Sequence, residues 1–272
     1  MKIGFIQFTP DFGNIERNLE KVRELSSGID ADILVLPELF NTGYLFVSEK
    51  EVEDLSEEIP GGRTTAALEK IARDRNVHIT AGLAEKSGGR FFNSAVLISP
   101  QGYMATYRKI HLFSEENLWF SPGDRPFEVY DIGKCRVGVM ICFDWIFPES
   151  MRVLALKGAD VVCHPANLVL PYCQDAMLTR CLENRVYAVT ANRTGVEERG
   201  GKVLRYTGKS QITGPDASIL CRAGSGAEET GVVEIDIEAA RNKRLNLFND
   251  LFSDRRPFFY RRVCDNMGKA LC

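Results

Sequence analysis

Short apolar runs alternate with amphipathic stretches along the first third of the chain. The apolar runs are rich in branched residues and predict buried strands at Ile3–Phe8, Ile33–Leu36 and Val77–Leu83. Between these runs, apolar residues recur at helical spacing after Asn14, which is a good helix cap, and again within Thr64–Arg75. Strands alternating with helices at this spacing indicate a layered α/β protein.

The second half of the chain repeats this order of elements. Its predicted strands, each similar to one in the first half, are Arg136–Ile141, residues 159–165 and Arg185–Asn192. Helical stretches fill the gaps at Pro148–Lys157 and Asp175–Asn184. We therefore expect two related halves and two sheets packed about an internal pseudo-twofold axis. A hairpin around Gln101 and a last strand at Gly231–Ile237 complete the predicted elements.

Composition and charge exclude several classes of protein. The chain has 272 residues, with 44% hydrophobic and 26% charged residues and a net charge of −3. These values are typical of a globular protein and give no basic excess for nucleic acid or an anionic membrane. No apolar stretch of about 18 residues predicts a membrane span, and Met1–Gln7 has too short an apolar run for a signal peptide.

The cysteines and the ends of the chain lead to further expectations. None of the eight cysteines falls in a Cys-x-x-Cys pair, which is typical of a reducing, cytoplasmic location. Because no linker interrupts the pattern, residues 1–260 are expected to form a single domain and residues 261–272 a tail. The aromatic and basic residues at 258–261 are expected to pack or to pair subunits, and Met267–Cys272 is expected to fray.

Three residues that could carry chemistry stand at or near strand ends, where function tends to sit in such folds. Glu38 follows five apolar residues, so burial is expected to raise its pKa. Cys142 follows an apolar run and precedes a helix opened by Pro148, whose N-terminus is expected to favour the thiolate. Lys109 lies beside aromatic residues and could act as a fixed cation. Taken singly, each also fits a plain structural role.

The sequence disfavours two kinds of cysteine site, a papain-like Cys–His pair and a zinc site. A papain-like enzyme needs a partner histidine, and the chain has only His78, His111 and His164. No residue that would orient His164 is evident from the spacing. A zinc site from His164, Cys163 and Cys173 lacks regular ligand spacing.

Taken together, the three candidates lie in the segments Pro-Glu-Leu, Arg-Lys-Ile-His-Leu and Cys-Phe-Asp, in that order. This arrangement resembles the nitrilase superfamily of carbon–nitrogen hydrolases. The resemblance extends over the chain through Glu-x-x-x-Phe-x-Pro-Gly-Asp at 116–124, Phe-Pro-Glu at 147–149 and His-Pro-Ala-Asn at 164–167. It implies a four-layer αββα sandwich, paired into a homodimer or larger homo-oligomer, with a Glu–Lys–Cys triad and neither metal nor organic cofactor.

The resemblance also implies a role for each residue, with a small molecule and water as the expected partners. Cys142 is the nucleophile, Glu38 the general base and acid, and Lys109 the cation that stabilises the tetrahedral species. Glu116 matches the family's second active-site glutamate, with the adjacent Glu115 as the alternative.

The substrate is less well specified by the sequence. Asp144 completes a Cys-aromatic-Asp segment, which resembles the amidase and carbamoylase branches more than the nitrile-cleaving branches, where Cys-Trp-Glu is more common. We therefore expect a small aliphatic amide or N-carbamoyl compound; the alternatives are a small nitrile or a catalytically inactive binding member. Arg180 is expected to face solvent or a partner, which disfavours an acidic substrate. Position alone predicts the substrate-binding residues Tyr44, Trp119, Phe143, Trp145 and Asn167.

Overall fold

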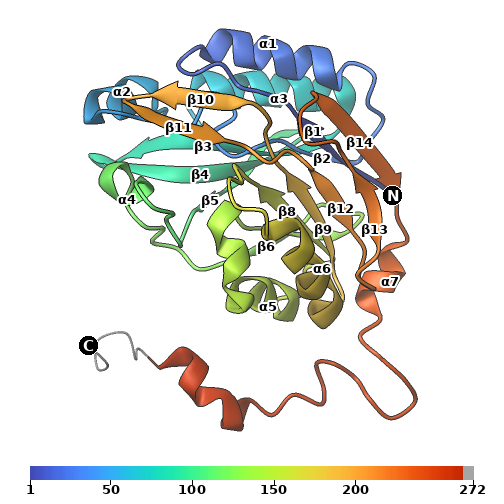
Figure 1. Ribbon diagram of the computed structural model, residues 1–272. Helices are drawn as coiled ribbons and strands as arrows, with labels where there is room; N and C mark the ends of the chain where they lie inside the picture. Colours follow the sequence, from blue (N-terminus) through green and yellow to red (C-terminus); the bar gives the residue numbers. More distant parts are fainter. Residues whose placement is uncertain (266–272) are drawn as a thin grey trace.

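The computed structural model describes residues 1–265 and shows two six-stranded sheets packed against each other, with helices on their outer faces (Figure 1). Side chains from the facing strands fill the space between the sheets, among them Phe5 and Val35 from one and Val161 and Val189 from the other. The predicted four-layer αββα sandwich is confirmed.

The first sheet has the strand order β14-β1-β2-β3-β4-β5. Its strands are β1 (Lys2–Gln7), β2 (Ile33–Val35), β3 (His78–Ser87), β4 (Arg90–Ser99), β5 (Gly102–Arg108) and β14 (Glu229–Glu234). Strands β1, β2 and β3 are parallel, and the others add antiparallel at the two sides.

The second sheet has the order β13-β12-β9-β8-β7-β6. Its strands are β6 (Val129–Asp131), β7 (Arg136–Val139), β8 (Val161–Pro165), β9 (Tyr187–Ala191), β12 (Gln211–Thr213) and β13 (Ile219–Arg222). Again a parallel trio, β7-β8-β9, has one antiparallel neighbour on one side and two on the other. The matching order confirms the repeat seen in the sequence.

Each sheet is covered by two helices whose apolar faces the sequence predicts. Helices α1 (Ile15–Ser26) and α3 (Arg63–Arg75) pack on the first sheet, and α5 (Pro148–Leu156) and α6 (Cys173–Asn184) pack on the second. The Asn14 side chain caps α1 by accepting a hydrogen bond from the Arg17 backbone at 3.3 Å, as expected.

The remaining elements are short. They are α2 (Glu49–Leu55), α4 (Glu116–Trp119), α7 (Ile237–Arg241), the 3₁₀ helices η1 (Cys142–Ile146) and η2 (Pro257–Cys264), and the hairpin β10 (Val196–Arg199) and β11 (Lys202–Arg205). Figure 1 shows η2 standing apart from the sandwich, beyond α5. Phe258 and Phe259 on η2 are mostly exposed, and the predicted frayed end Met267–Cys272 lies outside the described residues.

Several predicted strands are longer than the observed ones, and at two of them the structure shows why. The run at 136–141 leaves the sheet after Val139, because the Ile141 N–H donates to Asp144 Oδ2 at 2.8 Å and the chain turns there. The last strand ends at Glu234, and Ile237 instead begins α7, which Asp236 caps. In the described part of the chain, no helix is long and apolar enough to cross a membrane.

Candidate active site

The ends of strands from both sheets bring the three candidate residues into one buried site. Glu38 follows β2, Lys109 follows β5, and Cys142 follows β7. The Lys109 Nζ lies 2.7 Å from Glu38 Oε1 and 2.7 Å from Glu116 Oε1, and none of these three side chains is more than 3% exposed. The chain therefore places one ammonium group between two carboxylates at the interface of the sheets.

Close backbone packing fixes Glu38. A Cβ on Gly82 of β3 would stand only 2.5 Å from the Glu38 Cα, so only glycine lets the two segments approach this closely. Asn93 Nδ2 donates to Glu38 Oε1 at 2.7 Å, and Asn167 Nδ2 donates to the Glu38 backbone carbonyl at 2.8 Å. The other carboxylate oxygen, Oε2, is buried and has no hydrogen-bond partner among the described residues.

Burial acts in opposite directions on the pKa values of Glu38 and Lys109. Burial raises the pKa of Glu38, as the sequence indicated, and this outweighs the nearby Lys109 cation, which lowers it. Burial alone would lower the pKa of Lys109, but the carboxylates of Glu116 and Glu38 raise it above its ordinary value. Glu38 is thus a stronger base than an exposed carboxylate, while Lys109 stays a cation.

Cys142 sits on a tight turn that neighbouring side chains hold in place. Its φ of +39° is unusual for a residue with a side chain. The buried Asp144 accepts hydrogen bonds from the Ile141 N–H at 2.8 Å and the Tyr107 hydroxyl at 2.7 Å. Because the Cys142 carbonyl can only accept, His164 donates to it from Nε2, at 2.9 Å.

The thiol of Cys142 is not activated in the way that the sequence suggested. Burial raises its pKa well above the ordinary value, and the Glu38 carboxylate raises it further, against the lowering effect of Lys109. The expected thiolate at a helix N-terminus is wrong, because Cys142 begins a five-residue 3₁₀ turn and faces an acidic neighbour. Cys142 is therefore a thiol at neutral pH.

Among the described residues, the structure does not bring together the side chains that a papain-like site or a zinc site would need. The ring nitrogens of His164 bond to the Cys142 carbonyl and the Thr190 hydroxyl. His111 stacks on Phe147 at 3.7 Å, with Nδ1 2.7 Å from Asp144. Within residues 1–265, no three His, Cys, Asp or Glu side chains are grouped so that they could hold a metal ion.

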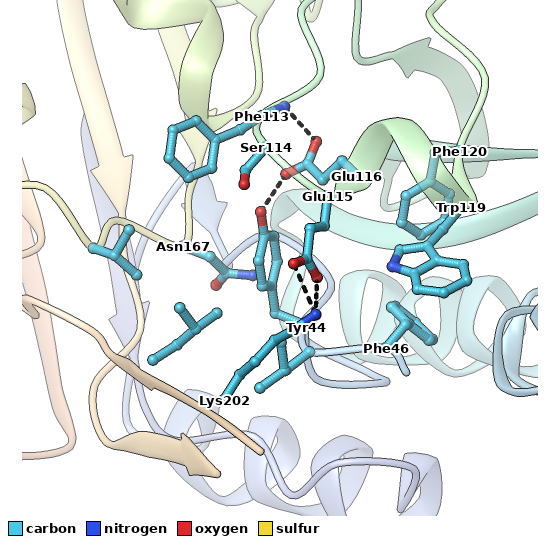
Figure 2. A pocket seen from close by; sticks show the side chains of 13 residues that line it. Tyr44, Phe46, Phe113, Ser114, Glu115, Glu116, Trp119, Phe120, Asn167 and Lys202 are labelled. Atoms are coloured by element: carbon cyan, nitrogen blue, oxygen red, sulfur yellow. Dashed lines mark hydrogen bonds and ion pairs between the residues drawn. The ribbon is translucent and has the colours of Figure 1, made fainter. Parts of the chain in front are cut away.

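A narrow cavity leads to Cys142. Its outer part has a volume of about 100 Å³, and a smaller space of about 20 Å³ adjoins Cys142; Phe113, Asn167 and Val169 line both. Figure 2 shows aromatic side chains around the outer part. The predicted pocket residues all line one or both spaces: Tyr44, Trp119, Phe143, Trp145 and Asn167.

The structure separates the two adjacent glutamates. Glu116 points inward, where it bonds to Lys109 and accepts from the Tyr44 hydroxyl at 2.7 Å (Figure 2). Glu115 instead pairs with Lys202 at the outer end of the cavity, with an N–O distance of 2.6 Å. Of these two, Glu116 is therefore the glutamate that contacts Lys109.

Sequence reasoning missed a second buried ion pair that holds the cavity wall. Glu197 of β10 accepts from the backbone N–H of Leu45 at 2.8 Å and from the Tyr206 hydroxyl at 2.8 Å, and it pairs with the fully buried Arg193. Gly43 allows this approach, since a Cβ there would stand 2.8 Å from Glu197 Oε1. Nothing in the local sequence marks Glu197 as buried, because strand β10 is otherwise largely exposed.

Arg180 also differs from expectation. Its side chain is only 15% exposed, and its Nε donates to the Trp145 carbonyl at 3.2 Å. The guanidinium therefore does not face open solvent, because carbonyls of the short turn η1 bind it; that Arg180 faces a partner stays a prediction. Arg180 thus supports the turn that carries Cys142.

The chain is similar to several known proteins. A nitrilase of Pyrococcus abyssi is 51% identical over 96% of this chain and 100% of its own length. An (R)-stereoselective amidase of Pseudomonas sp. is 36% identical over 94% of this chain and 92% of its own. A solved amidase from Nesterenkonia sp. AN1, with acrylamide added to its active-site cysteine, has a TM-score of 0.80 and 27% identity over 96% of this chain and 99% of its own.

The family model for carbon–nitrogen hydrolases matches residues 2–244, which include all three candidate residues and both sheets. The resemblance that the sequence suggested is thereby confirmed. This protein belongs to the carbon–nitrogen hydrolase family and is a hydrolase of that type.

Proposed function

We propose that the protein hydrolyses a small aliphatic amide or N-carbamoyl compound through a thioester on Cys142. The observation that carries this proposal is the buried Glu38, bound to Lys109 through one carboxylate oxygen and unpartnered at the other. An unpartnered buried oxygen next to a thiol and a fixed cation is well suited to move protons during acyl transfer.

The first half of the reaction forms the thioester. Glu38 takes the thiol proton as the Cys142 sulfur attacks the carbonyl carbon of the substrate. The oxyanion is stabilised by the Lys109 ammonium group and the Phe143 backbone N–H. Glu38 then gives its proton to the nitrogen, the carbon–nitrogen bond breaks, and ammonia leaves.

The second half releases the acid. Water occupies the place of ammonia, and Glu38 takes a proton from it as its oxygen attacks the thioester carbon. The carbon–sulfur bond breaks, and Glu38 returns the proton to the Cys142 sulfur. Glu116 holds Lys109 from its other side, while the Tyr44 hydroxyl fixes Glu116, so both act as positioning residues.

A nitrile is the second candidate substrate, favoured by the similarity to the nitrilase of Pyrococcus abyssi. The Cys142 sulfur would add to the nitrile carbon to give a thioimidate. Water would then add, and the loss of ammonia would leave the same thioester. Asp144, the residue that favoured amides in the sequence, bonds to Tyr107 and Ile141 behind the turn and does not line the cavity. Its effect on substrate choice is therefore indirect.

We also propose that the protein works as a homo-oligomer in the cytoplasm. Exposed apolar side chains lie on α5 and α6, including Val153, Leu156 and Leu182, and on η2, including Phe258 and Phe259. All seven cysteines within residues 1–265 are free thiols, which suits a reducing compartment. Light scattering after gel filtration tests the assembly: a monomer at micromolar concentration would contradict it.

The substrate proposal is tested by ammonia release from a matched panel. Each carbon skeleton is offered as amide, N-carbamoyl amine and nitrile to the wild type and to Cys142→Ala. Release from amides or carbamoyl compounds that depends on Cys142 supports the proposal. Release from nitriles alone would make the protein a nitrilase, and no release from any member would favour the inactive binding protein.

A further inference from the structure

Two oppositely charged side chains meet at the outer end of the substrate cavity. Lys202 of β11 places its Nζ 2.7 and 2.6 Å from the two carboxylate oxygens of Glu115. Both residues line the cavity, and Figure 2 shows the ion pair between them. Their side chains are 49% and 41% exposed, so this pair, which we call the mouth pair, borders the solvent.

The mouth pair sets the charge that the far end of a substrate meets. Among the residues that line the outer cavity, the charged side chains are Glu115, Glu116 and Lys202. Glu116 is buried and already paired with Lys109 on the inner side. The other lining residues are mostly apolar or aromatic. The two remaining charges, Glu115 and Lys202, cancel each other.

We propose that Glu115 and Lys202 determine specificity by selecting acyl groups whose far end is uncharged. This inference rests on the proposed amide hydrolysis and extends it to the choice of acyl group. A carboxylate at the far end of the substrate would be attracted to Lys202 and repelled by Glu115. An ammonium group there would be attracted to Glu115 and repelled by Lys202. Either charged end must break the pair, whereas an alkyl end leaves it intact.

Removing one member of the pair should therefore redirect specificity. An ion pair this exposed is weak, so its loss should not unfold the protein. The Glu115→Gln variant leaves Lys202 unopposed and should favour anionic substrates. The Lys202→Met variant keeps much of the apolar stem but leaves Glu115 unopposed, and it should favour cationic substrates.

The experiment measures kcat/KM for straight-chain primary amides that end in methyl, carboxylate or ammonium groups, at two matched chain lengths. For Glu115→Gln, the ratio of carboxylate-ended to methyl-ended amide should rise about fivefold, the value of one exposed ion pair. For Lys202→Met, the ratio of ammonium-ended to methyl-ended amide should rise about as much. The double variant has no pair to break and no charge that attracts either end, so both ratios should rise, but by less than in the single variants; added salt should reduce the single-variant effects.

Three other outcomes would overturn the inference. If the methyl-ended amide is cleaved but neither ratio moves in either single variant, the inference is wrong while the proposed function stands. An equal loss for all three amides would show that the pair only holds β11 against the segment at 115, and would also overturn it. If the wild type cleaves none of the amides and none of the matching N-carbamoyl amines, the proposed function fails and the inference fails with it.

Discussion

Replacing Gly82 by alanine tests whether the position of Glu38 controls the reaction. The new Cβ would stand 2.5 Å from the Glu38 Cα and 2.9 Å from the Leu39 backbone nitrogen, while ordinary contacts begin at 3.4 Å. The two backbones must therefore separate by about 0.9 Å, the difference between 3.4 and 2.5 Å. Both belong to buried chain segments, so neither can move without disturbing its neighbours.

The expected effect is larger on activity than on stability. A misplacement of about 1 Å can reduce catalysis about 100-fold, so kcat/KM should fall by this order. Overpacking of this kind costs about 1–3 kcal/mol, which should lower Tm by several degrees and leave the protein folded at 25 °C.

The assay combines ammonia release from the best amide with thermal unfolding followed by circular dichroism. Gly28→Ala is the matched control, because a Cβ at Gly28 meets no atom within 4 Å. Wild-type kcat/KM in Gly82→Ala, with the folded spectrum intact, would refute the argument that this contact positions Glu38.

Four further predictions concern the proposed triad and the neighbouring Tyr44. Because burial raises the pKa of Glu38, kcat/KM should rise with pH as Glu38 loses its proton, at an apparent pKa above the ordinary glutamate value. The Glu38→Gln variant should lose this rise with pH. An unchanged pH profile in Glu38→Gln would show that another group causes the rise. Since the pKa of Lys109 is also raised, activity should not fall between pH 8 and 10 through loss of the lysine charge; a fall in wild type near the ordinary lysine pKa would contradict the paired cation. Lys109→Met should slow thioester formation by about 100-fold or more in single-turnover experiments, and normal acylation would exclude its role. Tyr44→Phe, which removes one hydrogen bond to Glu116, should lower kcat several-fold with Tm nearly unchanged; an unaltered kcat would show that the hydroxyl does not position Glu116.

The sequence predicts the layers of this fold because periodicity is a local property. The branched runs that became β1 and β8, and the capped helix after Asn14, can each be identified within a short window of residues. The ends of the strands were predicted less accurately. At Ile141, for example, the Asp144 side chain competes with the sheet for the Ile141 backbone N–H. The domain boundary at residue 260 stays a prediction.

The candidate site was predictable as a set of residues, but its electrostatic environment was predictable only in part. Glu38, Lys109 and Cys142 could be found because they follow or adjoin strands and match a family pattern. The raised pKa of Cys142 depends on burial and on the distance to Glu38 across two sheets, which no local pattern encodes. Glu197 and Gly82 were missed for the same reason, since their partners lie far away in the chain.

The central claim is that Cys142 carries the acyl group, with Glu38 as its base. Rapid quenching of the enzyme with a slowly hydrolysed amide, followed by mass spectrometry of the intact protein and its peptides, tests this claim directly. The account predicts an acyl adduct on the peptide that contains Cys142, formed more slowly in Glu38→Gln and absent in Cys142→Ala. Turnover without an adduct at any time, or an adduct on another residue, would contradict it.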